Sequence, residues 1–264
     1  MNTSISKKLR SVALRPTASL HRQIAEQLGI SILTGKILPG EVLPTETALG
    51  TSLNVSRTAV REAIKVLTSK GLVEVRRKTG TRVRPQRDWN ALDPDIISWQ
   101  FSGSGLPAAI MDLLELRHII EPVSARMAAE RATSDDVAGI DAAFSNMEKA
   151  IGKTAASVEA DLQFHLAILE STHNSFMRPF GALIQAALRA SFRLTNQDAA
   201  AYQLSLVKHR AVLAAIRDQS PKRAEAAMHA VLDGTQQDIQ QAIEHQKARF
   251  ATRKPRKTAT KPRK

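Results

Sequence analysis

Residues 43–83 read LPTETALGTSLNVSRTAVREAIKVLTSKGLVEVRRKTGTRV and decide the fold of the first part of the chain. Pro44 and Thr45 are typical of a helix start, and Asn54 stands where that helix must end and turn sharply. Asparagine tolerates the positive φ of such a turn. Ser56 is a good N-cap for the next helix. We therefore predict two helices joined by a tight turn.

The second of these helices has an apolar face and a basic face. Val60, Ile64 and Leu67 recur at the spacing of a buried stripe. The residues left facing outward are Arg57, Thr58, Arg61 and Lys65. Arginine and threonine at such positions can contact base edges and phosphates in the major groove. The face predicts a recognition helix, although a charged helical face taken alone is more often merely solvated.

A short basic hairpin follows Gly71. Residues 72–76 and 81–84 alternate like two strands, and Arg77, Lys78, Thr79 and Gly80 form the tip between them. Such a tip can approach DNA closely as a wing. Because four elements agree in order and spacing, the run favours DNA binding over a solvated surface.

The segments PGEVLPTETAL, NVSRTAVREAI, GLVEV and TGTRV resemble the winged helix-turn-helix signature of the GntR regulators over residues 20–83. This resemblance implies DNA contacts from Thr47, Ser56, Arg57, Thr58, Arg61, Lys65, Arg77, Lys78 and Gly80. Many members carry Arg directly after the glutamate of LPxE, where this chain has Thr47. The sequence preference at that contact therefore stays open.

The net charge of +13 is unevenly distributed along the 264 residues. Residues 1–84 carry +10, residues 85–246 carry −6 and residues 247–264 carry +9. Such asymmetry indicates a nucleic-acid-binding head, a body that does not bind DNA and a basic tail. We predict a flexible basic arm (1–16), a winged helix-turn-helix domain (17–84), a connector (85–106), an all-α domain (107–246) and a disordered tail (247–264). The tail is read either as a solubility tail or as an auxiliary DNA tether.

Composition excludes several classes of function. The chain has no cysteine, which removes disulfides, thiolate metal sites and cysteine catalysis. It has no run of about 18 apolar residues, so we expect no membrane span. The N-terminus lacks the apolar segment of a secretory signal, so we expect a cytoplasmic protein.

The second part of the chain is predicted to be entirely helical. Apolar residues recur every three or four positions, and Gly and Pro are sparse. We expect helices near 107–131, 134–152, 156–172, 175–195, 202–218 and 221–246. In the connector, Trp89, Trp99 and Phe101 are expected to pack between the two domains. The fold class is mainly α: a winged helix-turn-helix followed by an all-α bundle.

Polar residues inside the apolar stripes indicate a binding site, because burying an unpaired charge is costly. Asp161 and His165 are i, i+4 neighbours on an inward face, and His209 and His229 fall in the stripes of later helices. A lone histidine on an apolar face is more often a hydrogen-bonded core residue. Three of them with an aspartate favour a shared metal site.

The helical part resembles the FCD effector domain of the FadR subfamily of GntR regulators. This resemblance implies a divalent metal held by Asp161, His165, His209 and His229, with zinc favoured over nickel, manganese or iron. It also implies that Arg117 faces the carboxylate of an effector, although a buried ion pair with Glu121 is an equal alternative. Weaker candidates for the effector pocket are Asn174, Arg193 and Thr195.

The connector WNALDPDIISW is similar to that of galactonate-type sugar-acid regulators. We therefore expect a homodimeric transcriptional regulator, most simply a repressor of a catabolic operon, that binds a pseudo-palindromic DNA operator and a small carboxylate such as a sugar acid. A metal-dependent enzyme with a DNA-binding head is one alternative; the chain shows no acid/base pair beside the ligands and no nucleophile motif. An architectural DNA-binding protein without an effector is the other.

Overall fold

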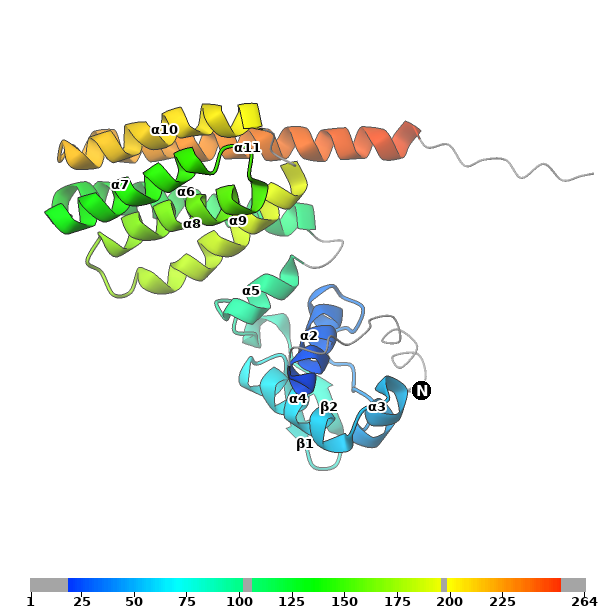
Figure 1. The fold of residues 1–264 in the computed structure, drawn as a ribbon. Helices are drawn as coiled ribbons and strands as arrows, with labels where there is room; N and C mark the ends of the chain where they lie inside the picture. Colours follow the sequence, from blue (N-terminus) through cyan, green and yellow to red (C-terminus); the bar gives the residue numbers. More distant parts are fainter. Residues whose placement is uncertain (1–18, 102–105, 196–198, 253–264) are drawn as a thin grey trace, which may run out of the picture. The chain divides into compact units, whose positions relative to one another are not determined.

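The computed structural model describes residues 19–101, 106–195 and 199–252. The chain divides into two compact units, of which the first comprises residues 1–113 with 176–187 and the second residues 114–175 with 188–264 (Figure 1). The fold is mainly helical with one small hairpin, which confirms the predicted fold class. The predicted arm falls on residues outside the described part.

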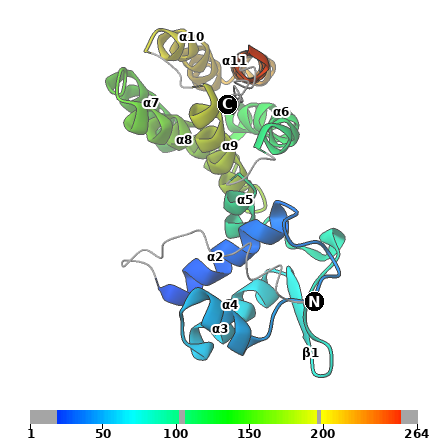
Figure 2. The same cartoon turned by 90° about the vertical axis from the view of Figure 1, so that its right-hand side faces the viewer.

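The first unit is built on three helices and a hairpin. The helices are α2 (Leu20–Leu33), α3 (Glu46–Leu53) and α4 (Arg57–Ser69), and the strands are β1 (Val73–Arg76) and β2 (Gly80–Val83). The strands pair antiparallel, with Val73 opposite Val83 and Arg76 opposite Gly80. In Figure 2 the hairpin turn projects beyond the neighbouring helices.

The turn between α3 and α4 follows from its local sequence. Asn54 ends α3 in the left-handed conformation with φ 54°. The side-chain oxygen of Ser56 accepts a hydrogen bond from the backbone N–H of Ala59 and caps α4. Gly50 keeps the turn tight, since a Cβ there would lie 3.0 Å from the carbonyl oxygen of Val55. The predicted helix-turn-helix is present.

The connector packs into the first unit. It contains a 3₁₀ turn (Gln86–Asp88) and α5 (Pro94–Gln100). The Trp99 ring lies directly over Gly29 of α2, where a Cβ would be 2.4 Å from the ring carbons. The indole N–H of Trp89 donates to the carbonyl oxygen of Arg84 at 3.0 Å. Both tryptophans therefore contribute to the core around α2 and α4.

This contact predicts a local loss of stability. The Gly29→Ala substitution should lower the free energy of unfolding of the first unit by about 1–3 kcal/mol, because the added methyl overlaps the Trp99 ring. The chain has two tryptophans, and both lie in this unit, so tryptophan fluorescence during urea unfolding reports on it. The Gly139→Ala variant should leave this transition unchanged, since no atom lies within 4 Å of a Cβ there. Equal transitions for Gly29→Ala and wild type would contradict the packing.

The second unit is a helical bundle. Its helices are α6 (Leu106–Arg131), α7 (Ser134–Lys149), α8 (Thr154–Glu170), α9 (Gly181–Thr195), α10 (Ala199–Arg217) and α11 (Pro221–Thr252), of which α6 and α9 begin in residues assigned to the first unit. Helix α10 packs along α11 and α7, and α7 packs along α8 (Figure 1). Small and aliphatic residues fill the core, with Phe144 and Phe164 edge to face.

Some boundaries differ from the prediction. The expected helix near 175–195 begins with a 3₁₀ turn at Arg178–Phe180, and the regular helix starts at Gly181. Helix α11 continues to Thr252, so residues 247–252 are helical and the predicted tail began too early. The physical reason is that Pro and Gly, which end helices, do not occur between Gly234 and Thr252. None of the described helices combines the length and the apolarity needed to cross a bilayer.

Candidate metal and effector site

Three buried residues of the second unit converge on one point. Asp161 and His165 lie one turn apart on α8, and His209 lies on α10. The Nε2 atoms of His165 and His209 lie 3.4 and 3.1 Å from Oδ1 of Asp161, and ligand atoms of all three residues lie within 4.8 Å of one another. The helical spacing of Asp161 and His165 places both on one face of α8, as predicted.

Each imidazole is oriented by a second contact. The Nδ1–H of His209 donates to the carbonyl oxygen of Ser205 at 2.8 Å, and the acceptor defines the tautomer. Nδ1 of His165 lies 2.6 Å from Oε2 of Glu121. Glu121 is in turn paired with Arg117, whose Nε lies 2.5 Å from Oε1. Partners of this kind fix the rings of metal-binding histidines so that the other nitrogen faces the ion.

The charges of the cluster depend on one another. Burial would raise the pKa of Asp161, but hydrogen bonding and charge from His165 and His209 outweigh burial and hold it well below its usual range. Burial likewise opposes ionisation of Glu121, yet the charges of Arg117 and His165 lower its pKa to about 2. Burial would lower the pKa of His165, but Glu121 and Asp161 raise it to about 9. Since metal ligation requires a neutral imidazole, a bound cation would have to displace that proton.

The donor set fits a divalent transition metal. Oδ1 of Asp161 and Nε2 of His209 are buried, and neither makes a well-angled hydrogen bond to any of the described residues. The two atoms lie 3.1 Å apart as an ion pair without good hydrogen-bond geometry, an arrangement that a shared cation would satisfy. One carboxylate and two imidazoles suit zinc, nickel, manganese or iron.

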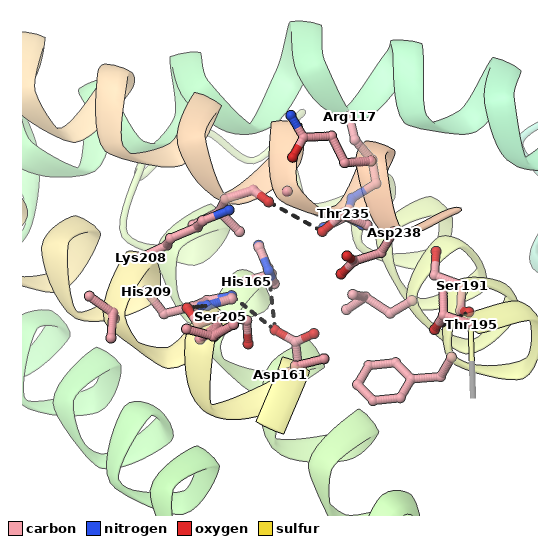
Figure 3. A pocket seen from close by; sticks show the side chains of 18 residues that line it. Arg117, Asp161, His165, Ser191, Thr195, Ser205, Lys208, His209, Thr235 and Asp238 are labelled. Atoms are coloured by element: carbon pink, nitrogen blue, oxygen red, sulfur yellow. Dashed lines mark hydrogen bonds and ion pairs between the residues drawn. The ribbon is translucent and has the colours of Figure 1, made fainter. Parts of the chain in front are cut away.

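The cluster opens into a cavity of about 450 Å³ (Figure 3). Arg117 lines it together with Leu188, Ser191, Phe192 and Thr195 of α9, Ser205 and Lys208 of α10, and Val231, Gly234, Thr235 and Asp238 of α11. Although Glu121 holds Nε and Nη2 of Arg117, its buried Nη1 has no hydrogen-bond partner in the described part of the chain. The wall thus combines one guanidinium group with several hydroxyl groups.

In the first unit, the exposed face of α4 carries the predicted DNA contacts. Glu46 of α3 bridges Arg57 and Arg61, with its Oε2 3.1 Å from Nε of Arg57 and 3.0 Å from Nη2 of Arg61. Lys65 pairs with Glu62 at 2.8 Å. Thr47, Ser56 and Thr58 are exposed, as are Arg77, Lys78 and Gly80 at the hairpin tip. Gly80 adopts φ 80°, a conformation that glycine allows without strain.

Both parts of the chain match known protein families. Residues 7–83 match the bacterial regulatory proteins of the gntR family, and residues 112–234 match the FCD domain. The galactonate operon transcriptional repressor of Escherichia coli K12 is 37% identical over 78% of this chain and 90% of that protein. The chain belongs to the GntR family of bacterial transcriptional regulators. Its head is therefore DNA-binding, and it is a regulator, not an enzyme.

Two further comparisons agree with this assignment. The HTH-type transcriptional regulator YieP of Escherichia coli K12 is 33% identical over 85% of this chain and 97% of that protein. A solved structure of Lar, which controls the expression of the Listeria monocytogenes agr system, matches with a TM-score of 0.63 over 86% of this chain and 99% of that chain. At 16% identity, the latter likeness shows a shared fold alone.

The structure of this GntR regulator does not bring His229 to the metal cluster. His229 is exposed on α11 and stacks on His118, with the ring centroids 6.1 Å apart. Val231, two positions after His229 on α11, lines the cavity instead. The buried stripe of α11 runs through Ala224, Met228, Val231 and Leu232, about 100° around the helix from His229. The described cluster therefore has three of the four expected ligands.

The residues predicted to bind the effector also differ in whether they line the cavity. Thr195 lines the cavity, whereas Arg193 and Asn174 do not. Helix α9 presents Leu188, Ser191, Phe192 and Thr195 at i, i+3, i+4 and i+7, which turns the intervening Arg193 outward. Asn174 lies in the turn beyond the end of α8, well past His165. Arg117 forms the expected ion pair with Glu121 and also lines the cavity, whereas its contact with an effector stays a prediction.

The polar residues of α10 and α11 in the cavity wall were not predicted from the sequence. Lys208 directly precedes His209, and Thr235 and Asp238 follow Val231 at helical spacing. The adjacency of Lys208 to a candidate ligand was an available signal. The cavity-lining residues of α11 could be predicted only if the buried face of that helix were known.

Proposed function

We propose that this GntR regulator is a repressor whose DNA binding is controlled by a small carboxylate, most simply a sugar acid, bound at a metal site in the FCD unit. The observation that carries the proposal is the buried Asp161, His165 and His209 cluster at the wall of a cavity that Arg117 also lines. Metal ligands and a guanidinium in one cavity are suited to a carboxylate.

Asp161, His165 and His209 would hold the metal, and the metal would supply open coordination positions to the oxygens of the effector. Glu121 and the Ser205 carbonyl keep the two imidazoles oriented. The rigid placement of these side chains on α8 and α10 lowers the entropic cost of binding an ion.

Arg117 is positioned to bind the carboxylate. Its pairing with Glu121 fixes the guanidinium at the cavity wall and leaves the buried Nη1 without a partner among the described residues. Hydroxyl groups of Ser191, Thr195 and Thr235 line the same cavity and can exchange hydrogen bonds with a polyhydroxy chain. A hydroxylated acid therefore matches the wall better than an aliphatic acid does.

The relatives support the same class of effector. The galactonate operon transcriptional repressor is similar over most of both chains, so galactonate is the first probe to use. Two copies of the chain would place the α4 helices in successive major grooves of a pseudo-palindromic operator. In this arrangement Arg57 and Arg61 read bases or phosphates, and Lys65, Arg77 and Lys78 hold phosphates.

Metal content and galactonate binding test the site together. Wild type purified without chelator should contain about one metal ion per chain and bind galactonate in isothermal titration calorimetry, but not the neutral galactitol. The His209→Ala variant should lose both the metal and the binding, because one of three ligands is removed. His209 suits this test because its Nδ1–H contacts a backbone carbonyl. Removing His165 would instead leave the buried carboxylate of Glu121 without one of its partners.

The matched control is His229→Ala, which removes a histidine that lies outside the cluster. This variant should keep the metal content and galactonate affinity of wild type. Loss of metal in His229→Ala, or wild-type metal content in His209→Ala, would contradict the assigned ligand set. Wild-type protein that binds metal but no sugar acid would contradict the proposed effector class.

A further inference from the structure

Lys208 lines the cavity, and its side chain extends from α10 to α11. It lies on α10 directly before His209, and its Nζ packs against α11 at Gly234. A Cβ built on Gly234 would lie 2.2 Å from Nζ and 3.5 Å from Cε of Lys208. The ammonium group therefore occupies the space that any larger residue at position 234 would fill.

Gly234 belongs to the face of α11 that lines the cavity. Val231, Gly234, Thr235 and Asp238 follow one another at i, i+3, i+4 and i+7, and all four line it together with Lys208. A glycine inside a helix costs about 1 kcal/mol relative to alanine. Here the glycine creates a notch, and the notch is filled by the Lys208 ammonium.

Lys208 lines the cavity together with the carboxylates of Asp161 and Asp238 but forms no ion pair with either of them. None of the ion pairs among the described residues involves Lys208, whereas Arg117 has Glu121 as its partner. A half-buried ammonium in a cavity wall without an ion-pair partner is suited to an anion from outside the chain.

We infer that Lys208, held in the notch at Gly234, is a specificity-determining cation that binds the carboxylate of the effector. This inference rests on the proposed function and deepens it. Figure 3 shows Lys208 and His209 on one side of the cavity, Ser191 and Thr195 on the opposite side, and Asp161 between them. The carboxylate lies toward Lys208 and the metal ligands, and the hydroxylated tail extends toward Ser191 and Thr195.

The arrangement selects one class of ligand. Such a cavity takes an acyclic polyhydroxy acid with the charge at one end, such as an aldonate. The corresponding neutral alditol lacks the group that Lys208 binds. A hydrogen bond to a charged group contributes enough that its loss changes affinity about 10- to 100-fold.

A double-mutant cycle tests the role of the notch. Galactonate is titrated into the metal-loaded full-length protein as wild type, Lys208→Met, Gly234→Ala and the double variant. We expect Lys208→Met to weaken binding about 10- to 100-fold. Gly234→Ala should weaken it in the same direction by displacing the ammonium, and it should add little further loss in the Lys208→Met background.

Lys222→Met, at an exposed lysine of α11 outside the cavity lining, controls for the loss of one positive charge. Metal content should match wild type in all variants, since none of them alters a ligand. Wild-type galactonate affinity in Lys208→Met, or fully additive losses in the double variant, would overturn the inference. Failure of the wild type to bind any aldonate would instead overturn the proposed effector class and, with it, this inference.

Discussion

Replacing Arg57 and Arg61 together by alanine should weaken binding to a specific operator by about 100-fold or more. Both side chains are exposed on the first turns of α4 and are held side by side by Glu46. A good contact of arginine to a base contributes about 1–3 kcal/mol of discrimination, and every 1.4 kcal/mol is tenfold in affinity. Loss of two such contacts should leave mainly binding that is independent of DNA sequence.

Fluorescence anisotropy with DNA selected from a random pool by the wild type measures this effect. The control is Arg217→Ala with Arg223→Ala, because these exposed arginines of the second unit are also in surface ion pairs and their loss changes the net charge equally. The control pair should bind as wild type does. Unchanged affinity of the Arg57 and Arg61 variant would show that α4 is not the recognition helix.

The second large effect concerns the response to the effector. The His209→Ala variant should bind the operator as tightly as wild type does in the absence of galactonate and should no longer respond when galactonate is added. The reason is that His209 lies in the second unit, whereas the predicted DNA contacts all lie in the first. A site can shift an equilibrium only through a difference in its binding free energy between two states, and this variant removes that binding.

His229→Ala again provides the matched comparison and should keep the full response, since this exposed residue contacts His118 and not the cluster. Anisotropy titrations of both variants with and without galactonate measure the response. A full response in His209→Ala would show that the metal cluster does not mediate the response to galactonate.

The DNA-binding head was predictable because its signals are local. The left-handed Asn54, the N-cap at Ser56 and the glycine at the hairpin tip each act within a few residues of their position. The apolar stripe of α4 had one consistent reading, with Val60, Ile64 and Leu67 all buried. The order of elements therefore followed directly from the amino-acid sequence.

The fourth ligand was mispredicted because α11 allows two readings of its apolar face. The stripe through Ala226, His229 and Leu232 looks as regular as the stripe through Ala224, Met228 and Val231. In the first stripe only Leu232 is buried, whereas all three residues of the second stripe are buried. The choice depends on which neighbours α11 packs against, and this information is not local to the helix. Arg193 was proposed only because it lies near the end of a helix, and its side chain is exposed on α9.

Lys208 and Gly234 illustrate a further limit. Their contact joins two helices, and neither residue alone suggests a cavity wall. Asp161 and His165 were predictable as neighbours because their spacing within one helix places them on the same face. The position of His209 beside them depends on how α10 packs in the bundle. Spacing within a helix is fixed by local geometry, but the alignment between helices is fixed by packing.

The central claim is that a carboxylate at the Asp161, His165 and His209 cluster controls DNA binding by the other unit. The most direct test is the dissociation constant of wild-type, metal-loaded protein for its selected operator, measured by anisotropy with and without galactonate at a concentration that calorimetry shows to be saturating. The account predicts that galactonate weakens operator binding by about 5- to 150-fold, the usual range of allosteric coupling, and that chelation of the metal removes the effect. Equal dissociation constants with and without bound galactonate would contradict it.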